Sequence, residues 1–394
     1  MFRVNQEPNG HIKGFANWGV YTPGMLYSAA KHFLLSGERE SFERLLPQAL
    51  RSLDWCLEQV RTAATRSGPG QGLVLRPLND LSHEDRAWAF NQAYFFAGMD
   101  AFGKALKQIG HPRAGECAAA AQSIHRAVQQ EFARATVESP LIQLRDGTWS
   151  PYVPSDATFP GRRLQTWYPT DIDTGPLHLS RLQALEPAGP LTDYLLNDHE
   201  DNLFLGGLSM ANEPVYNQHA TAYLLRDEVK PAIRAFYSMM ACAFSHQQLT
   251  PLEHRWAWGQ YYMPPSTDGA WFELYRNLLL NELAADGTLF IGQAVPRAWL
   301  ADGKRIAVER APTAFGPVNL QIESAAASGS LTAKIEFLSD RRPQTLRVRL
   351  RHPEKRTLRS VTVNGADAPD FDPASEWVRI PQPLEARYTV VGRY

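Results

Sequence analysis

Three acidic residues in separate, loop-like segments are the best candidates for chemistry in this sequence: Asp173, Glu213 and Glu253. Two carboxyl groups that face one cavity can act as a general acid and a general base when their surroundings separate their pKa values. Large aromatic side chains stand close in sequence to Asp173 and to Glu253. The sequence therefore predicts acid–base catalysis by carboxylates, provided that the fold brings these segments together.

Asp173 follows an aromatic pair in the stretch WYPTDIDTGPLHL, which begins at Trp167 and Tyr168. Asp171 and Asp173 are separated by one residue, so in an extended loop their side chains face the same side. Asp171 also suits the N-cap of a helix that the pattern predicts from residue 172. Two interpretations stay open for this pair: a helix cap, or contacts with substrate in which Trp167 and Tyr168 also take part.

Glu213 stands directly before Pro214, which favours extended backbone at the glutamate and a helix that starts just after it. The positive end of a helix favours an ionised carboxylate, so Glu213 suits the role of general base. The alternative is a glutamate that only complements the helix dipole. His219 follows in the same stretch and suits either a hydrogen bond to a substrate hydroxyl or a place in the core.

Glu253 lies in the stretch TPLEHRWAWGQYYMPP beside Trp256 and Trp258. Burial beside such rings raises the pKa of a carboxyl group and suits a general acid. Arg255 acts in the opposite direction, because a nearby guanidinium keeps a carboxylate ionised. Glu253 and Arg255 are therefore either parts of a site, in which Arg255 could also bind the carboxylate of a ligand, or a structural ion pair.

Apolar spacing predicts helices through most of residues 23–285, arranged in pairs. The first pair covers 23–37 and 40–64, the second covers 87–110 and 112–135, and further helices are predicted at 172–185, 190–199, 215–226, 228–247 and 267–285. The helix at 87–110 is apolar around most of its circumference and its successor is polar on one side, which is typical of an inner helix and an outer one. The links that lead to the next inner helix are long and hold the candidate residues; they cover 65–86, 136–171, 200–214 and 248–266.

From about residue 287 the pattern changes to alternation with a period of two, in eight short stretches separated by turn residues. Eight short strands with no helix between them indicate an antiparallel β-sandwich. Arg341, Arg342, Arg347, Arg349 and Arg351 fall in this region, and alternating basic residues are typical of a solvated strand face. The predicted fold class is multidomain α+β, with a helical domain at 1–286 and a β-sandwich domain at 287–394.

Three long stretches carry a resemblance: NWGVYTPGMLYSAAKHFLLSG from residue 17, FNQAYFFAGMDAFGKALKQIG from residue 90, and VPRAWLADGKRIAVERAPTAFGPVNLQIES from residue 295. Helical hairpins followed by a small C-terminal β-sandwich resemble the six-hairpin glycosidase superfamily, whose members are α/α toroid enzymes that act on carbohydrates. A full toroid of that superfamily has twelve helices, whereas the pattern here indicates about nine. The resemblance thus implies a toroid that is incomplete, or a chain that is part of a longer protein.

The resemblance implies hydrolysis of a glycosidic bond in a plant or bacterial oligo- or polysaccharide. In an inverting glycosidase one carboxylic acid protonates the leaving group and one carboxylate activates water, with the two groups ~6.5–9.5 Å apart. Toroid glycosidases are often inverting. From the acids and aromatic residues of the loops, we expect Glu213, Glu253 and Asp173 to be catalytic. The expected substrate-binding residues are Asp171, Trp167, Tyr168, His219, Arg255, Trp256 and Trp258.

Two other classes of protein fit the same pattern. A polysaccharide lyase would abstract a proton beside a uronate with Tyr or His while Asn or Arg neutralises the carboxylate. Its candidate residues are Tyr216, Asn217, His219, His254 and Arg255. The other class is a non-catalytic carbohydrate-binding remnant of a larger enzyme. Binding of sugar without turnover would indicate that class.

The composition favours a neutral partner. Forty basic and forty-one acidic residues give a formal net charge of −1, which creates no global field toward nucleic acid or an anionic membrane. Cys56, Cys117 and Cys242 lack the spacing of a zinc site or a disulfide framework, and no metal or cofactor motif occurs. We therefore expect a carbohydrate substrate, with no cofactor, metal, nucleic acid or membrane. Further partners could be a second copy of the chain or a missing N-terminal portion.

No export signal or membrane-length apolar run is visible, which predicts a cytoplasmic protein, or a periplasmic or secreted one if an N-terminal portion is missing.

Overall fold

The structure is a computed structural model of the full chain, and it describes residues 5–14, 17–78, 84–161, 175–204, 219–245, 249–252, 265–283 and 286–394. The chain divides into two compact units. The first, here called the helical unit, consists of Met1–Phe33, Glu38–Ala222 and Met239–Thr267. The second, here called the sandwich unit, consists of Leu34–Gly37, Tyr223–Ser238 and Asp268–Tyr394. The domain ranges expected from the sequence, 1–286 and 287–394, stay predictions.

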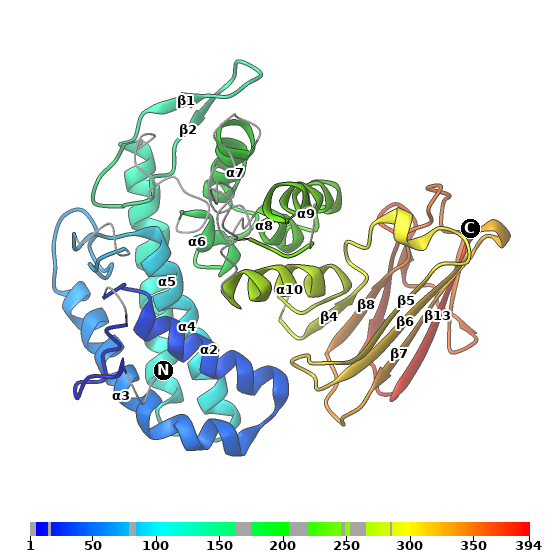
Figure 1. Ribbon diagram of the computed structural model, residues 1–394, viewed down its shortest axis with the longest axis horizontal. Helices are drawn as coiled ribbons and strands as arrows, with labels where there is room; N and C mark the ends of the chain where they lie inside the picture. Colours follow the sequence, from blue (N-terminus) through cyan, green and yellow to red (C-terminus); the bar gives the residue numbers. More distant parts are fainter. Residues whose placement is uncertain are drawn as a thin grey trace. The chain divides into compact units, whose positions relative to one another are not determined.

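The helices follow the predicted pattern closely (Figure 1). They are α2 (Tyr21–Ser36), α3 (Arg39–Ala64), α4 (Ala89–Gln108), α5 (Ala114–Val137), α6 (Leu177–Arg181), α7 (Pro190–Asp198), the π-helix η1 (His199–Phe204), α8 (His219–Leu225), α9 (Val229–Ala243) and α10 (Pro265–Leu279). The helix expected at 172–185 is shorter than predicted, because Gln183 takes a φ of 61° soon after Arg181. Among the described residues, no helix is long and apolar enough to cross a membrane.

Helix α4 is the central helix of the described part of the helical unit. Its buried positions go round most of the helix, whereas those of α3 and α5 fall on one side, which confirms the predicted inner and outer roles. It packs against α5 and α6, and its Phe102 lies 5.9 Å from Phe42 of α3, measured between ring centroids. Phe95 and Phe102 are fully buried. Removal of this apolar surface from water is the main favourable term for the packing of these helices.

A short hairpin in the long link before α6 was not expected. Strands β1 (Leu141–Gln143) and β2 (Trp149–Pro151) pair antiparallel around the dipeptide Asp146–Gly147. Gly147 takes a φ of 89°, which a side chain would disfavour. An Asp-Gly pair between alternating apolar residues is a recognised hairpin signal, so the sequence did contain the information.

Gly98 allows α2 and α4 to approach each other closely. A Cβ atom at this position would lie 2.5 Å from the backbone oxygen of Pro23 in α2, where no side chain can move aside. We expect Gly98→Ala to lower the free energy of unfolding by about 1–3 kcal/mol, because the two helices must separate. Chemical denaturation measures this change.

Gly115 provides the matched control for this prediction. It lies in α5, and a Cβ atom there would meet nothing within 4 Å. Gly115→Ala should therefore raise the free energy of unfolding, by up to about 1 kcal/mol, through the better helix propensity of alanine. Equal effects of the two substitutions would contradict the close packing of α2 on α4.

The sandwich unit contains two β-sheets (Figure 1). The six-stranded sheet has the order β10-β9-β13-β7-β6-β5 and the five-stranded sheet has the order β11-β12-β8-β4-β3. The strands are β3 (Leu280–Asn281), β4 (Thr288–Ile291), β5 (Arg305–Ala311), β6 (Val318–Ala325), β7 (Ser330–Phe337), β8 (Thr345–Arg349), β9 (Ser360–Val363), β10 (Ala366–Asp367), β11 (Phe371–Asp372), β12 (Trp377–Pro381) and β13 (Arg387–Arg393). All eight predicted strands are present; the pairing of β4 with β8 is parallel, and the other pairings are antiparallel.

Alternation of buried and exposed residues builds the sandwich core. In β6 and β7 every second side chain is buried, and these side chains include Leu320, Ile322, Leu331 and Ile335. They join apolar residues from β4, β8 and β13 in one cluster. The period of two that was visible in the sequence therefore marks the inward face of each sheet.

The interpretation of the arginine run as a solvated face is wrong for Arg349 and Arg351. Arg349 is only 4% exposed, and its Nη1 and Nη2 donate to the two carboxylate oxygens of Asp227 at 2.9 and 2.8 Å. Trp377 Nε1 donates to Asp227 Oδ2 at 2.8 Å, and the guanidinium carbon of Arg349 lies 4.1 Å from the centroid of the Trp377 ring. Burial lowers the pKa of Arg349, and its hydrogen bonds to Asp227 oppose that change. Arg351 is 7% exposed and donates to the backbone oxygen of Val295.

Candidate functional site

Nine of the ten predicted site residues lie outside the described residues. They fall in three segments, 162–174, 205–218 and 253–264. The nine are Trp167, Tyr168, Asp171, Asp173, Glu213, Glu253, Arg255, Trp256 and Trp258, and the lyase candidates Tyr216, Asn217 and His254 fall in the same segments. The tenth, His219, is the first residue of α8. The roles assigned to these residues stay predictions.

The order of the elements relates these three segments to one another. Each of them precedes a helix, α6, α8 or α10 respectively, and these are every second helix along the chain. The N-cap position of α6 is occupied by Pro176, not by Asp171, and α8 starts at His219 rather than directly after Glu213. In chain order, the predicted carboxylates therefore fall in the connections before three alternate helices.

Described aromatic side chains cluster at the N-terminal halves of α2, α4 and α6. Tyr94 of α4 lies 6.1 Å from Tyr27 of α2, 5.1 Å from Phe90 and 6.1 Å from His178 of α6, measured between ring centroids. Its hydroxyl accepts a hydrogen bond of 3.4 Å from Nη1 of Arg181, which is the last residue of α6. Tyr94 is half-buried, so this ring links three alternate helices and keeps some contact with the surface.

Two buried amides fix the chain that approaches α4. Asn91 Nδ2 donates to the backbone oxygens of Arg76 and Pro77 at 3.2 and 3.0 Å. Gln92 Oε1 accepts from the backbone N–H of Val74 at 3.0 Å, and Gln92 Nε2 donates to the backbone oxygen of Val74 at 2.8 Å. Both amides are fully buried. Neither amide was among the predicted site residues, although FNQAY places two polar residues in an otherwise apolar helix.

A second polar network holds the N-terminal segment on the helical unit. His11 is 6% exposed; its Nδ1 lies 3.0 Å from Thr22 Oγ1 and its Nε2 lies 2.7 Å from Asn17 Oδ1. Asn17 Oδ1 can only accept, so Nε2 carries the proton of the neutral ring, and Nδ1 then accepts the proton of the Thr22 hydroxyl, whose oxygen also accepts the N–H of Ile12. Burial lowers the pKa of His11, which agrees with a neutral ring. This histidine is therefore structural.

Two described carboxylates near the start of α4 have different surroundings. Asp156 is 1% exposed and accepts hydrogen bonds from Thr158, which marks it as structural. Asp85 is exposed. Burial lowers the pKa of Arg76, and the charge of Asp85 opposes this. Asp80, in the same link before α4, lies outside the described residues. In the described ranges, no group of three or more His, Cys, Asp or Glu side chains could hold a metal ion.

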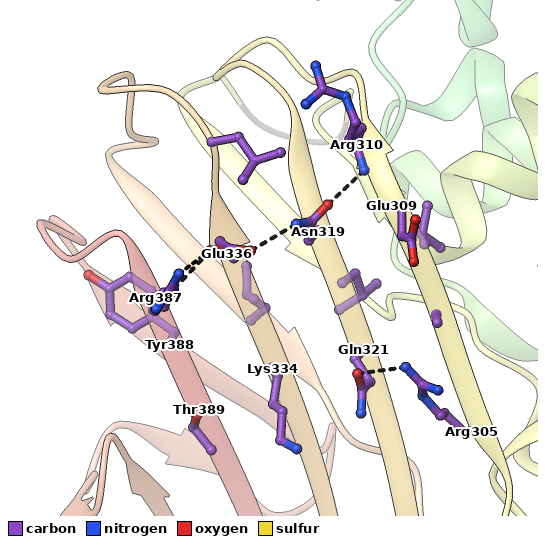
Figure 2. Close-up of a pocket in the computed structure, with 15 residues that line it drawn as sticks. Arg305, Glu309, Arg310, Asn319, Gln321, Lys334, Glu336, Arg387, Tyr388 and Thr389 are labelled. Carbon is purple, nitrogen blue, oxygen red and sulfur yellow. Dashed lines mark hydrogen bonds and ion pairs between the residues drawn. The ribbon is translucent and has the colours of Figure 1, made fainter.

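A shallow pocket of about 640 Å³ lies on the outer face of the six-stranded sheet (Figure 2). Glu336 at its centre accepts from Asn319 Nδ2 and from Arg387 Nε, both at 2.8 Å, and Gln321 accepts from Arg305 at 2.9 Å. These polar groups satisfy one another across neighbouring strands, which is typical of a solvated sheet face. The pocket therefore carries no signal for catalysis.

Comparisons with known proteins support the architecture. No protein-family model and no curated protein matches the sequence. An α-L-rhamnosidase from Dictyoglumus thermophilum aligns with 100% of this chain and 43% of its own, at 10% identity and a TM-score of 0.55. An α-L-rhamnosidase from Streptomyces avermitilis, solved with L-rhamnose, aligns with 99% of this chain and 35% of its own, at 13% identity and a TM-score of 0.51.

Both neighbours belong to the six-hairpin glycosidase superfamily, so the chain has the fold that the resemblance implied. The fold class is confirmed as multidomain α+β, with helical hairpins followed by β-sheets. The chain spans less than half the length of either neighbour. At these identities the similarity concerns the fold alone.

Proposed function

We propose that the chain is a glycoside hydrolase that uses a pair of carboxyl groups. The observation that carries the proposal is the fold shared with two α-L-rhamnosidases. The position of the candidate acids supports it, because Asp173, Glu213 and Glu253 precede α6, α8 and α10 in turn. Connections before alternate helices are where a fold built of helical hairpins can gather catalytic groups.

The proposed mechanism assigns a role to each acid. Glu213 is the proposed base, because it precedes α8 without the tryptophans that stand beside Glu253 in sequence and favour a neutral carboxyl group. Glu253 is the acid that protonates the leaving group, since the neighbouring Trp256 and Trp258 favour the neutral form. Asp173 and Arg255 hold the sugar. The course is inverting, with a water molecule between the base and the anomeric carbon.

The proposed substrate is a neutral glycoside, and α-L-rhamnosides come first because of what the two neighbours are named for. A panel of p-nitrophenyl glycosides tests this with the purified chain. Release of p-nitrophenol from at least one glycoside supports hydrolysis. An ultraviolet-absorbing unsaturated product from a polyuronate would indicate a lyase instead. Binding of oligosaccharides without turnover of any compound would indicate a carbohydrate-binding protein and overturn the proposal.

A further inference from the structure

The hairpin β1–β2 of the helical unit exposes a tryptophan on its outward face. The strand register places four side chains on this face, here called the Trp149 face: Leu141, Gln143, Trp149 and Pro151. Trp149 is 62% exposed and Leu141 is 59% exposed. The opposite face, with Ile142 and Ser150, is buried. The hairpin therefore packs through one face and presents an indole ring to solvent with the other.

The Trp149 side chain has no partner within the described ranges of the chain. Its ring contacts no other ring and no guanidinium there, and its Nε1 donates no hydrogen bond. Trp55, Trp88 and Trp377 are by contrast buried. Exposure of a large apolar ring to water is unfavourable, and a ligand that covers the ring would recover that free energy.

Several contacts hold the hairpin in one position. Asp146 Oδ1 accepts hydrogen bonds from the backbone N–H of Thr148 at 2.9 Å and from its hydroxyl at 2.7 Å, which fixes the turn. The backbone N–H of Arg145 donates to Asp201 Oδ2 in η1 at 2.9 Å, and β2 packs against α7 (Figure 1). A ligand that binds the Trp149 face therefore has little chain to order, which lowers the entropy cost of binding.

The chemistry of the Trp149 face suits a neutral sugar. The negative face of an indole ring attracts the C–H groups on one side of a pyranose, and the ring loses little conformational entropy on binding. Gln143 stands directly opposite Trp149, with the two Cβ atoms about 5 Å apart. Its amide can donate to one hydroxyl and accept from another. The four side chains of the face are uncharged, so the face offers no ion pair to an acidic or basic partner.

The size of the Trp149 face favours a sugar over a protein. A stable protein–protein interface buries roughly 800 Å² per partner and uses about 20–30 residues a side. The Trp149 face consists of four side chains on two strands of three residues each. A second copy of the chain would gain too little buried surface here, whereas a sugar ring covers an indole ring completely.

We propose that the Trp149 face is a carbohydrate-binding surface, which holds a sugar unit of a neutral polysaccharide on the helical unit. Trp149 stacks on the C–H side of the sugar, and Gln143 binds its hydroxyls. The choice of a carbohydrate rests on the proposed function, but no step of the proposed hydrolysis uses these residues. The surface retains a polymer on the protein and takes no part in cleavage of a small glycoside.

Affinity electrophoresis of the full chain tests this proposal. Native gels contain a rhamnan, an arabinoxylan or a mixed-linkage β-glucan as neutral polymers, or polygalacturonate as an anionic polymer, and the retardation gives the dissociation constant. Trp149→Thr removes the ring but keeps a residue that favours strands, and Trp149→Phe keeps a ring. Phe272→Ala is the control, because Phe272 is 65% exposed on α10 in the sandwich unit.

We expect at least one neutral polymer to retard the unchanged protein. Trp149→Thr should weaken that binding at least about fivefold, through loss of one aromatic stacking contact. Trp149→Phe should bind more tightly than Trp149→Thr, and Phe272→Ala should stay within about twofold of the unchanged protein. Equal binding by Trp149→Thr and the unchanged protein overturns the proposal, as does retardation by polygalacturonate alone or by no polymer.

Oxidation by N-bromosuccinimide tests the surface without any substitution. Mass spectrometry of the unchanged protein follows oxidation of Trp149, with and without the polymer that retards it most. We expect the polymer to slow this oxidation at least about threefold, because a stacked sugar covers the ring. Unchanged oxidation of Trp149 in the presence of bound polymer contradicts the proposal.

Turnover separates this proposal from the proposed function. In Trp149→Thr, kcat/KM for a p-nitrophenyl glycoside should stay within about twofold of the unchanged protein, while cleavage of the bound polymer at low concentration falls at least about fivefold. An equal fall for the small glycoside would place Trp149 at the catalytic site and overturn the proposal. Absence of turnover in the unchanged protein counts against hydrolysis alone, because the gels measure binding without it.

Discussion

Glu213→Gln and Glu253→Gln should each lower kcat on an activated glycoside by about 10²–10⁴-fold, which is the usual contribution of a general acid or base. The amide keeps the size of the side chain but can neither donate a carboxyl proton nor accept one. Steady-state kinetics across the pH range measures the effect. Glu213→Gln should remove the acidic limb of the pH profile, because that limb reports ionisation of the base. Glu253→Gln should remove the alkaline limb.

Glu38→Gln is the matched control. Glu38 is an exposed carboxylate that precedes α3, which is not one of the alternate helices α6, α8 and α10 that follow the candidate acids. Its kcat should stay within about twofold of the unchanged protein. If all three variants keep normal rates and both limbs, the assignment of the catalytic acids is wrong. If only one limb is lost, a single acid is assigned correctly and Asp173→Asn is the next variant to measure.

Asp227→Ala should cause the largest loss of stability, about 2–4 kcal/mol in the free energy of unfolding, because Arg349 is buried although the Asp227 side chain is 36% exposed. The substitution leaves the guanidinium of Arg349, only 4% exposed, without its carboxylate partner. It also removes the acceptor of Trp377 Nε1. Chemical denaturation followed by tryptophan fluorescence measures the change.

The double variant Asp227→Ala with Arg349→Met should recover most of that loss, because the guanidinium that lost its carboxylate partner is then removed as well. Glu43→Ala is the control, because its ion pair with Arg39 has side chains that are 44% and 61% exposed and should contribute less than about 1 kcal/mol. A loss below about 1 kcal/mol in Asp227→Ala would contradict the account of this ion pair.

Local patterns predicted most of the fold. The apolar period of α3, α4 and α5 and the alternation in β6 and β7 can be seen within short stretches of sequence. Each of these stretches forms one helix or one strand, so its own pattern was enough to predict it. The hairpin β1–β2 was missed although its Asp146–Gly147 turn was visible, because each strand has only three residues. The short helix α6 was overestimated, because apolar spacing does not show where a residue such as Gln183 takes a positive φ.

Long-range partners explain what the sequence could not predict. Arg349 was assigned to a solvated face from its neighbours in sequence, but its partner Asp227 comes from the turn between α8 and α9. The buried Gln293, whose amide donates to the backbone oxygen of Leu224 and accepts from Asn281, has long-range partners of the same kind. For the candidate site, chemistry and loop length selected Asp173, Glu213 and Glu253, and the element order now assigns them to the connections before α6, α8 and α10. Their mutual distances depend on tertiary structure and cannot follow from spacing.

Proton NMR of a cleavage reaction tests the central claim most directly, since it follows the anomeric configuration of the first product. An inverting glycosidase with a carboxyl pair predicts a sugar whose anomeric configuration is initially opposite to that of the substrate, followed by slow mutarotation. An unsaturated product, or a sugar released with unchanged configuration, would contradict the proposed mechanism. No new anomeric signal with any glycoside of the panel would contradict the assignment as a hydrolase.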